Sequence, residues 1–220
     1  ILVSFSVSGI SKGIGETEIT TDDGIEVFQN EKYYLLKKNV KIISDDFEIT
    51  SDLVKANFDT DLYDITSLET KGNSKLNAIK YGVVGKGDKI DINVKSEEIT
   101  VYGKDSILNL EETKMVSDGS INVNNLLGTF ELSGSKSNLQ NDTLDIHGEY
   151  ISGVFSELNG KKQIIKLDIQ DKNLIKINTE NLELYSQKAT YDDQTKIIEL
   201  YSKVKIIKGQ EIITGDYGYF

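Results

Sequence analysis

Side chains able to carry out acid–base or nucleophilic chemistry are sparse in this chain. His147 is the only histidine, and it stands within a strand-like stretch that runs from Asp145 to Gly148. A Ser-His-Asp triad would have to use this one residue. A single histidine in a strand is typically a surface or rim residue, so we expect His147 to have no catalytic role and the chain not to be an enzyme.

Acidic residues offer the next candidate chemistry, as glycosidase carboxylates or calcium ligands. Three adjacent Asp-Asp pairs occur, namely Asp22-Asp23, Asp45-Asp46 and Asp192-Asp193. All three fall in predicted turns, where Asp accepts hydrogen bonds from the backbone. The stretch Gly85–Asp91 faintly resembles a calcium-binding nonapeptide, but it occurs once and lacks paired glycines, so a hairpin turn explains it better. We expect neither a metal site nor a cofactor.

The composition limits the classes of partner. The chain has 220 residues and a formal net charge of −11, and all of its 25 basic residues are lysines scattered along the sequence. Because neutralising phosphates requires a basic face, this charge argues against nucleic acid as a partner. Cysteine is absent, so disulfides and thiolate metal sites are excluded. No apolar run is long enough to form a membrane-spanning helix.

One strand-turn-strand unit occurs twice. Its two copies are Val40-Lys-Ile-Ile43 followed by Ile49-Thr-Ser-Asp52, and Val204-Lys-Ile-Ile207 followed by Ile213-Thr-Gly-Asp216. The spacing within the two copies is identical, and both are preceded by a lysine and a leucine at matching positions. The apolar period is close to two, so the unit is a β-hairpin.

Short alternating runs separated by turn residues fill the chain from residue 16 onward. The stretch Lys89–Lys95 places Ile90, Ile92 and Val94 on one face and polar residues on the other, as in strands with one dry face. Asn159-Gly160 is the strongest hairpin signal, and Gly134-Ser135 marks another predicted turn. The spacing predicts an all-β fold of roughly 18 to 20 antiparallel strands in one domain over residues 16–220. Either two facing sheets or one sheet rolled over would bury the dry faces.

The first residues are apolar and small, and a polar chain follows at once. This pattern is typical of the end of a secretory signal peptide with its small-residue cleavage site. We therefore expect residues 1–15 to hold a signal remnant and the mature N-terminus, and the protein to be exported. An ordinary first strand is the alternative.

The two copies of the repeat resemble the repeat of the OstA family, the periplasmic lipopolysaccharide-transport protein LptA and its relatives. The residues that carry the resemblance are Lys32–Ser44 with Thr50-Ser-Asp52, Lys196–Gly209 with Thr214-Gly-Asp216, and the A-x-Y-D-like lead-ins Ala56–Asp59 and Ala189–Asp192. The resemblance covers about residues 16–76 and 180–220. The usual Gly before the valine is Asn39 in one copy and Lys203 in the other, which leaves an LptC-like component or a paralogue open.

This resemblance implies an elongated antiparallel β-jellyroll, open at both ends, in a Gram-negative periplasm. Such a protein binds lipopolysaccharide, shields the lipid A acyl chains in an apolar β-groove, and passes them from the inner to the outer membrane within a protein bridge. Each buried methylene is worth about 0.8 kcal/mol, so chains in transit need an apolar channel. The positions that we predict to contact lipid are Leu36, Val40, Ile42, Phe47, Ile49, Ile65, Ile90, Ile92, Val94, Val101, Phe130, Leu132, Leu144, Ile146, Ile198, Leu200, Val204, Ile206 and Ile213.

An open jellyroll leaves unpaired strand edges that can pair with another chain. We predict such edges near Ile25–Phe28 and Glu211–Phe220, for OstA-fold partners of the inner and outer membranes or for a head-to-tail homo-oligomer. Lys32 and Lys208 could instead block these edges. Two rival functions stay open: a structural β-solenoid or surface-fibre module without a ligand, and a polysaccharide-acting enzyme whose carboxylates converge in a cleft.

Overall fold

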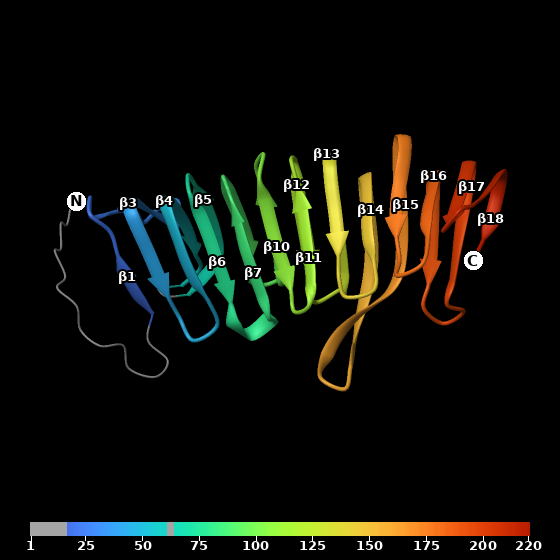
Figure 1. Ribbon diagram of the computed structural model, residues 1–220. Coiled ribbons are helices and arrows are strands. Elements are labelled where there is room, and N and C mark those ends of the chain that lie inside the picture. The colour runs from blue at the N-terminus through green and yellow to red at the C-terminus, as the bar shows by residue number, and fades with distance from the viewer. Residues whose placement is uncertain (1–16, 61–63) are drawn as a thin grey trace.

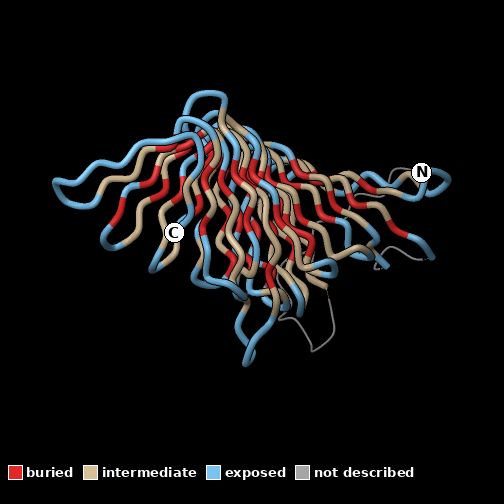
Figure 2. The backbone as a smooth tube through the Cα atoms, turned by 90° about the vertical axis from the view of Figure 1, so that its right-hand side faces the viewer, coloured by how far each residue is buried: buried red, intermediate tan, exposed pale blue. Residues whose placement is uncertain are grey.

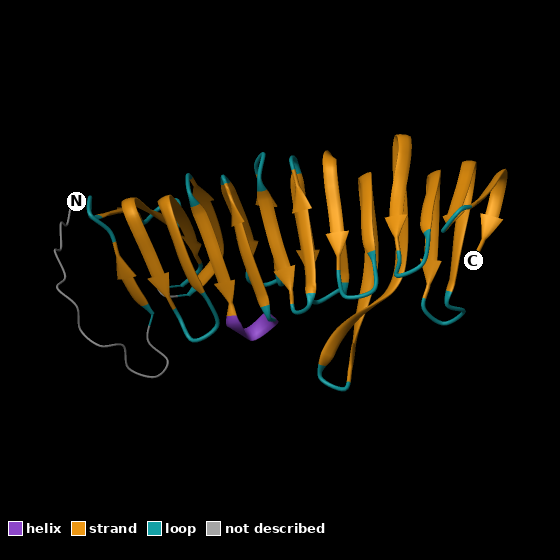
Figure 3. Ribbon diagram, viewed as in Figure 1, coloured by secondary structure: helices purple, strands orange, loops and turns teal. Residues whose placement is uncertain are grey.

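The computed structural model describes residues 17–60 and 64–220, which form one long sheet of 18 antiparallel strands (Figure 1). The all-β fold and the strand number predicted from the sequence are confirmed. Within the described ranges, the one helical segment is the short 3-10 helix η1 (Ile79–Tyr81), shown in purple in Figure 3. No helix in this part of the chain is long and apolar enough to cross a membrane. The predicted signal remnant lies outside the described residues.

The strands follow one another along the long axis of the molecule, from β1 at one end to β18 at the other. In chain order they are β1 (Glu18–Thr20), β2 (Ile25–Phe28), β3 (Tyr33–Ile43), β4 (Glu48–Phe58), β5 (Ile65–Lys71), β6 (Ser74–Ala78), β7 (Val83–Gly87), β8 (Lys89–Asn93), β9 (Glu98–Tyr102), β10 (Ser106–Leu110), β11 (Thr113–Ser117), β12 (Ser120–Asn124), β13 (Thr129–Gln140), β14 (Asp145–Leu158), β15 (Lys161–Asn178), β16 (Glu183–Asp192), β17 (Ile197–Lys208) and β18 (Glu211–Tyr219).

Strand pairing divides the sheet into two walls. The first wall contains β2, β5, β8, β9 and β12, and the second contains β1, β6, β7, β10 and β11. The long strands β3, β4 and β13 to β18 contribute one half to each wall. We call the edge where the chain passes from one wall to the other the spine, and the opposite edge the mouth.

The long strands cross the spine through left-handed residues. In β3 the pairing register shifts at Lys38 and Asn39, whose φ angles are 62° and 49°. In β17 it shifts at Ser202 and Lys203, whose φ angles are 63° and 55°. Positive φ favours Gly and tolerates Asn, which explains why this position before the valine of the repeat is often Gly in the family that the sequence resembles.

The two copies of the repeat therefore adopt the same local structure. Beyond the bend, Val40 pairs with Ser51 in β4, and Val204 pairs with Gly215 in β18. In each copy the valine comes directly after the spine and points inward, where it is buried. The equal spacing in the sequence reflects one bent hairpin that the chain forms twice.

The short strands turn at the spine instead of bending through it, and their turns stack on one another. The Asp52 N–H donates to the Gly72 carbonyl at 2.9 Å, Gly72 to Asp88 at 2.7 Å, and Asp88 to Tyr102 at 2.8 Å. These bonds satisfy backbone groups that the turns would otherwise leave unpaired between the walls.

Two turn predictions have different outcomes. Asn159-Gly160 forms the tight turn between β14 and β15, with φ angles of 55° and 77°, as predicted. Gly134-Ser135 is not a turn between strands but the bend within β13, where the strand passes from one wall to the other. Glycine and serine occur in turns between strands and in bends within a strand, because a turn and a bend each require an unusual backbone geometry next to small side chains.

The core lies between the two walls. Inward side chains are buried on strand after strand, and Figure 2 shows these positions in red along neighbouring strands. Gly85 in the second wall faces Val101 and Ile90 of the first: a Cβ placed on Gly85 would lie 3.3 Å from Val101 Cγ2 and 3.9 Å from Ile90 Cδ1. The walls are thus in van der Waals contact in the middle of the molecule.

At the spine, two segments of backbone approach each other so closely that one glycine has no room for a side chain. A Cβ added to Gly119, in the turn between β11 and β12, would lie 2.2 Å from the Ser133 carbonyl oxygen. We expect Gly119→Ala to lower the free energy of unfolding by about 2 kcal/mol or more, because backbone must move. Gly215→Ala is the control, since its nearest neighbour would lie 3.4 Å away, and it should change stability by less than about 0.5 kcal/mol. Urea denaturation measures both, and equal stabilities would contradict the close packing of the spine.

Candidate functional site

The candidate site is the apolar interior between the walls. Most of the positions predicted to contact lipid lie there with their side chains buried: Leu36, Val40, Ile42, Ile49, Ile90, Ile92, Val101, Phe130, Leu132, Ile146, Ile198, Leu200 and Val204. They come from both walls, because β-alternation turns every second residue inward. The structure therefore places these residues along one interior. Whether lipid contacts them stays a prediction.

Four further predicted positions lie at the rim of this interior. Phe47, Ile65, Leu144 and Ile206 are partly buried and pack against the core. Phe47 and Leu144 lie in the turns before β4 and β14, and Ile65 begins β5. These residues line the places where the interior meets solvent, which is where a ligand would first touch the protein.

Two predicted positions are not in the interior. Val94 was expected to continue the row of Ile90 and Ile92, but β8 ends at Asn93, and Val94 lies in the following turn with 39% of its surface exposed. Ile213 pairs with Ile206 on the inward face, but it belongs to the end strand β18 and is 63% exposed. Alternation alone could not locate the end of a strand or an uncovered end of the sheet.

Several core residues of the second wall were missed. Leu76, Val83 and Met115 are buried, and they come from β6, β7 and β11. These strands have five residues each, and several of their inward positions hold Ser, Gly or Ala instead of a large apolar residue. The alternation in Ser74–Ala78 was present in the sequence, and it was the signal that could have identified this strand.

Small polar residues close the spine side of the interior. Ser51 Oγ lies 3.1 Å from Ser74 Oγ, and the Thr70 hydroxyl donates to Ser74 at 2.6 Å. Further along, Ser117 Oγ lies 3.3 Å from Ser137 Oγ. The Ser51 hydroxyl also donates to the Lys71 carbonyl at 3.1 Å, and the Ser117 hydroxyl to the Ser133 carbonyl at 2.9 Å. These two bonds and the one from Thr70 to Ser74 cross from one wall to the other, so the interior cannot open on this side without losing several hydrogen bonds.

The mouth side is open near the C-terminal end. A cavity of about 230 Å³ lies between Leu144 on the second wall and Ile164 and Tyr191 on the first. A larger cavity of about 740 Å³ follows, bordered by Leu144, Leu182 and Phe220. The smaller cavity is a gap between the mouth edges, because residues of both walls border it. The larger one is bordered by three turns of the second wall and by Phe220, which follows β18.

The polar groups that border the smaller cavity include three carboxylates, those of Glu112, Asp142 and Asp193, together with Lys162 and several neutral side chains. The Tyr191 hydroxyl donates to Asp193 at 2.7 Å, and burial together with this bond raises the pKa of Tyr191 to about 12. Hydrogen bonds from Lys196 and Tyr191 lower the pKa of Asp193. A ligand with apolar chains would thus pass an ionised rim before reaching the apolar interior.

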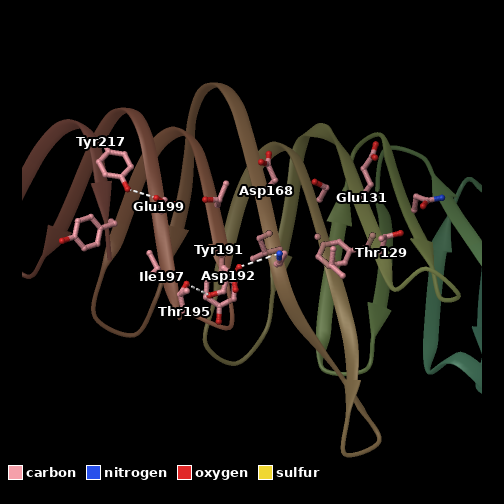
Figure 4. Close-up of a pocket in the computed structure, with 18 residues that line it drawn as sticks. Thr129, Glu131, Asp168, Tyr191, Asp192, Thr195, Ile197, Glu199 and Tyr217 are labelled. Carbon is pink, nitrogen blue, oxygen red and sulfur yellow. Dashed lines mark hydrogen bonds and ion pairs between the residues drawn. The ribbon is translucent and has the colours of Figure 1, made fainter.

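A further hollow lies on the outer face of the first wall, and both polar and apolar side chains line it. It measures about 830 Å³ and runs across the strands from Asn122 to the tyrosines of β18 (Figure 4). Its carboxylates already have partners: Tyr150 donates to Glu131 at 2.9 Å, and Tyr217 to Glu199 at 2.7 Å. Hydrogen-bonded surface groups of this kind do not indicate a catalytic pair.

His147 lies on β14 and is exposed, as predicted. Its Nε2 is 3.2 Å from Asp145, which also accepts hydrogen bonds from Asn138 and Asn178. Among the described residues, no three His, Cys, Asp or Glu side chains are grouped to hold a metal ion.

The burial of two leucines predicts how much each contributes to the stability of the fold. Leu108 is fully buried in the middle of the second wall, so Leu108→Ala should lower the free energy of unfolding by about 2 to 5 kcal/mol. Leu144 lies at the rim, and Leu144→Ala should cost about 1 kcal/mol or less. Thermal unfolding of the two variants measures this difference. Equal losses would show that Leu144 is part of the packed core and not of an opening.

Comparison with known proteins found similarity to a solved structure, but no match by sequence. No protein-family model and no curated protein matches the chain. Among solved structures, the chain is similar to LptH of Pseudomonas aeruginosa, the LptA-homologous periplasmic component of the lipopolysaccharide transport device. The two share 10% sequence identity over 54% of this chain and 82% of LptH, with a TM-score of 0.46. At this identity and TM-score, the likeness by itself supports no conclusion about what this chain binds.

Proposed function

We propose that this protein holds lipid acyl chains between its two walls and passes lipopolysaccharide across a Gram-negative periplasm. One observation carries the proposal: a continuous apolar interior meets solvent at a gap between the mouth edges, beside Leu144, Ile164 and Tyr191. An acyl chain needs such an interior, because a chain of about ten methylenes gains roughly 8 kcal/mol when it is fully buried.

Carriage of this kind requires no catalyst. Inward residues such as Ile90, Leu132, Ile146 and Ile177 are similar in size and polarity, and they repeat from strand to strand. An acyl chain would find nearly equal contacts at each step, so it could slide along the interior without a deep trap. The direction of movement would then have to come from an energy source elsewhere in the transport system.

The ends of the sheet support passage to a partner of similar fold. Ile25 and Val27 of β2 belong to the inward row at one end, pairing with Leu36 and Tyr34, yet both are exposed. At the other end Ile213 is exposed on the inward face of β18. A partner strand that paired with either edge would cover these residues and extend the interior.

The alternative was that lysines block these edges, and the structure bears on one of them, Lys32. Lys32 lies 3.1 Å from Asp59 in an ion pair within its own chain, so its charge is partly compensated. Edge pairing with OstA-fold proteins or with a second copy therefore stays part of the proposal.

A structural module without a ligand is the second candidate. The observation in its favour is the contact of the two walls at Gly85, which leaves no room for an acyl chain there as the walls stand. Under the carrier proposal the walls must separate locally in this region to admit a chain. The following experiment separates the two candidates.

Photo-crosslinking tests whether lipid enters between the walls. A photo-reactive phenylalanine analogue at the position of Ile206 faces inward, and the same probe at Lys205 faces outward, where the lysine lies over the Tyr185 ring. With lipid A micelles as the ligand, we expect at least a tenfold higher yield from position 206. Leu144 should give a yield similar to that of Ile206, because it borders the opening.

Equal labelling at the inward and outward positions would defeat the carrier proposal. Labelling at neither position, in a protein whose circular dichroism shows the folded sheet, would favour the structural module.

Self-association tests the exposed end strand. Ile213→Lys places a charge on the inward face of β18, and Ile212→Lys places the same charge on its opposite face at similar exposure. If a second copy extends the interior, Ile213→Lys should weaken association at least tenfold, while Ile212→Lys should have a smaller effect. Sedimentation velocity over a range of concentrations measures this. Equal effects of the two variants would contradict a shared interior.

A further inference from the structure

One hairpin extends beyond the mouth edge of its own wall. In this hairpin the end of β14, from Phe155 to Leu158, pairs with the start of β15, from Lys161 to Ile164. These paired residues lie past the point where β13 begins and β16 ends. This hairpin projects below the neighbouring turns in Figure 1. We call the segment Phe155–Ile164 the strap.

The strap contacts the opposite wall. Lys161 Nζ lies 2.8 Å from Glu112 Oε1, and the Lys162 N–H donates to Glu111 Oε2 at 2.9 Å. The Lys162 ammonium also donates to the carbonyl of Tyr81 in η1. Glu111, Glu112 and Tyr81 all belong to mouth turns of the second wall, whereas the strap arises from the first. The strap therefore bridges the mouth.

The base of the strap packs against the interior through two apolar residues. Phe155 is buried, and Ile164 packs against the core. The Lys162 ammonium lies over the Phe155 ring at 5.8 Å from its centre. Burial lowers the pKa of Lys162, while the carboxylates of Glu111, Glu157 and Glu97 act in the opposite direction. Lys162 is thus enclosed between the strap and the second wall.

The cavities of the mouth lie on one side of this bridge. Residues of the strap, Lys162 to Ile164, border the cavity of about 230 Å³, and the cavity of about 740 Å³ lies further toward β18. On the other side of the strap are β6 to β9, where inward residues of both walls are buried. The strap separates an open part of the mouth from a closed one.

We infer that the strap is a closure across the mouth, and that acyl chains first bind on its C-terminal side, at the opening lined by Leu144, Ile164 and Tyr191. This inference rests on the proposed carrier function and adds the place and the control of access. The Lys161–Glu112 pair is exposed, and exposed ion pairs contribute little to stability. The strap can therefore release the second wall without unfolding the sheet, and its release lets acyl chains advance toward β8.

Locking the strap tests this directly, because the chain contains no cysteine. In the variant Lys161→Cys with Glu112→Cys, a short bismaleimide joins the strap to the second wall. The control is Lys172→Cys with Glu149→Cys, which replaces another ion pair of β15. Its charged atoms lie 2.7 Å apart, against 2.8 Å for Lys161 and Glu112, and it joins β15 to β14 away from the mouth. Photo-reactive probes at the positions of Ile92 and Leu144 then report lipid A on the two sides of the strap.

We expect the lock across the mouth to reduce labelling from position 92 at least fivefold and to leave labelling from position 144 unchanged. The control lock should change neither. Equal labelling from position 92 in locked and unlocked protein would overturn the strap inference while leaving the carrier function standing. Loss of labelling from both positions on locking would show that chains enter beneath the strap and not beside it, which also overturns the inference. Absence of labelling from both positions without any lock would instead contradict the carrier function itself.

Discussion

Neither wall of this molecule can bury its apolar face alone, and this constraint determines the rest of the structure. Each wall presents a row of Ile, Leu and Val on one side, so the two faces must meet. They meet because the chain crosses the spine repeatedly, through left-handed residues such as Asn39 and Lys203 or through tight turns such as that at Gly119. Hydrogen bonds such as that from the Thr70 hydroxyl to Ser74 then hold the walls together at the spine.

The same constraint limits where a ligand could bind. The spine is closed by hydrogen bonds, and the middle is closed by contact between the walls at Gly85 and by the strap. The mouth near Leu144 is left as an opening that leads to apolar surface. The structure combines a firmly joined spine with a mouth held by exposed ion pairs, so under the proposed carrier function loading would require separation on one side of the sheet only.

The sequence predicted the architecture better than the site. The repeat at Val40 and Val204 and the alternation around Ile90 indicated bent hairpins with one buried face, and both features appear in the structure. The end of β8 before Val94 and the uncovered position of Ile213 depend on where neighbouring strands stop, which alternation does not encode. The strap contacts join residues as far apart as Tyr81 and Lys162, and no local pattern in the sequence marks such a pair.

The central claim is that an apolar interior between two walls admits acyl chains. Native mass spectrometry of the protein, purified without detergent from Gram-negative cells, tests this most directly. The account predicts a bound acyl lipid in a fraction of the molecules, and its loss in a Leu144→Asp variant that remains folded. A spectrum that shows only the unliganded mass, for protein also incubated with lipid A, would contradict it and leave a ligand-free structural module.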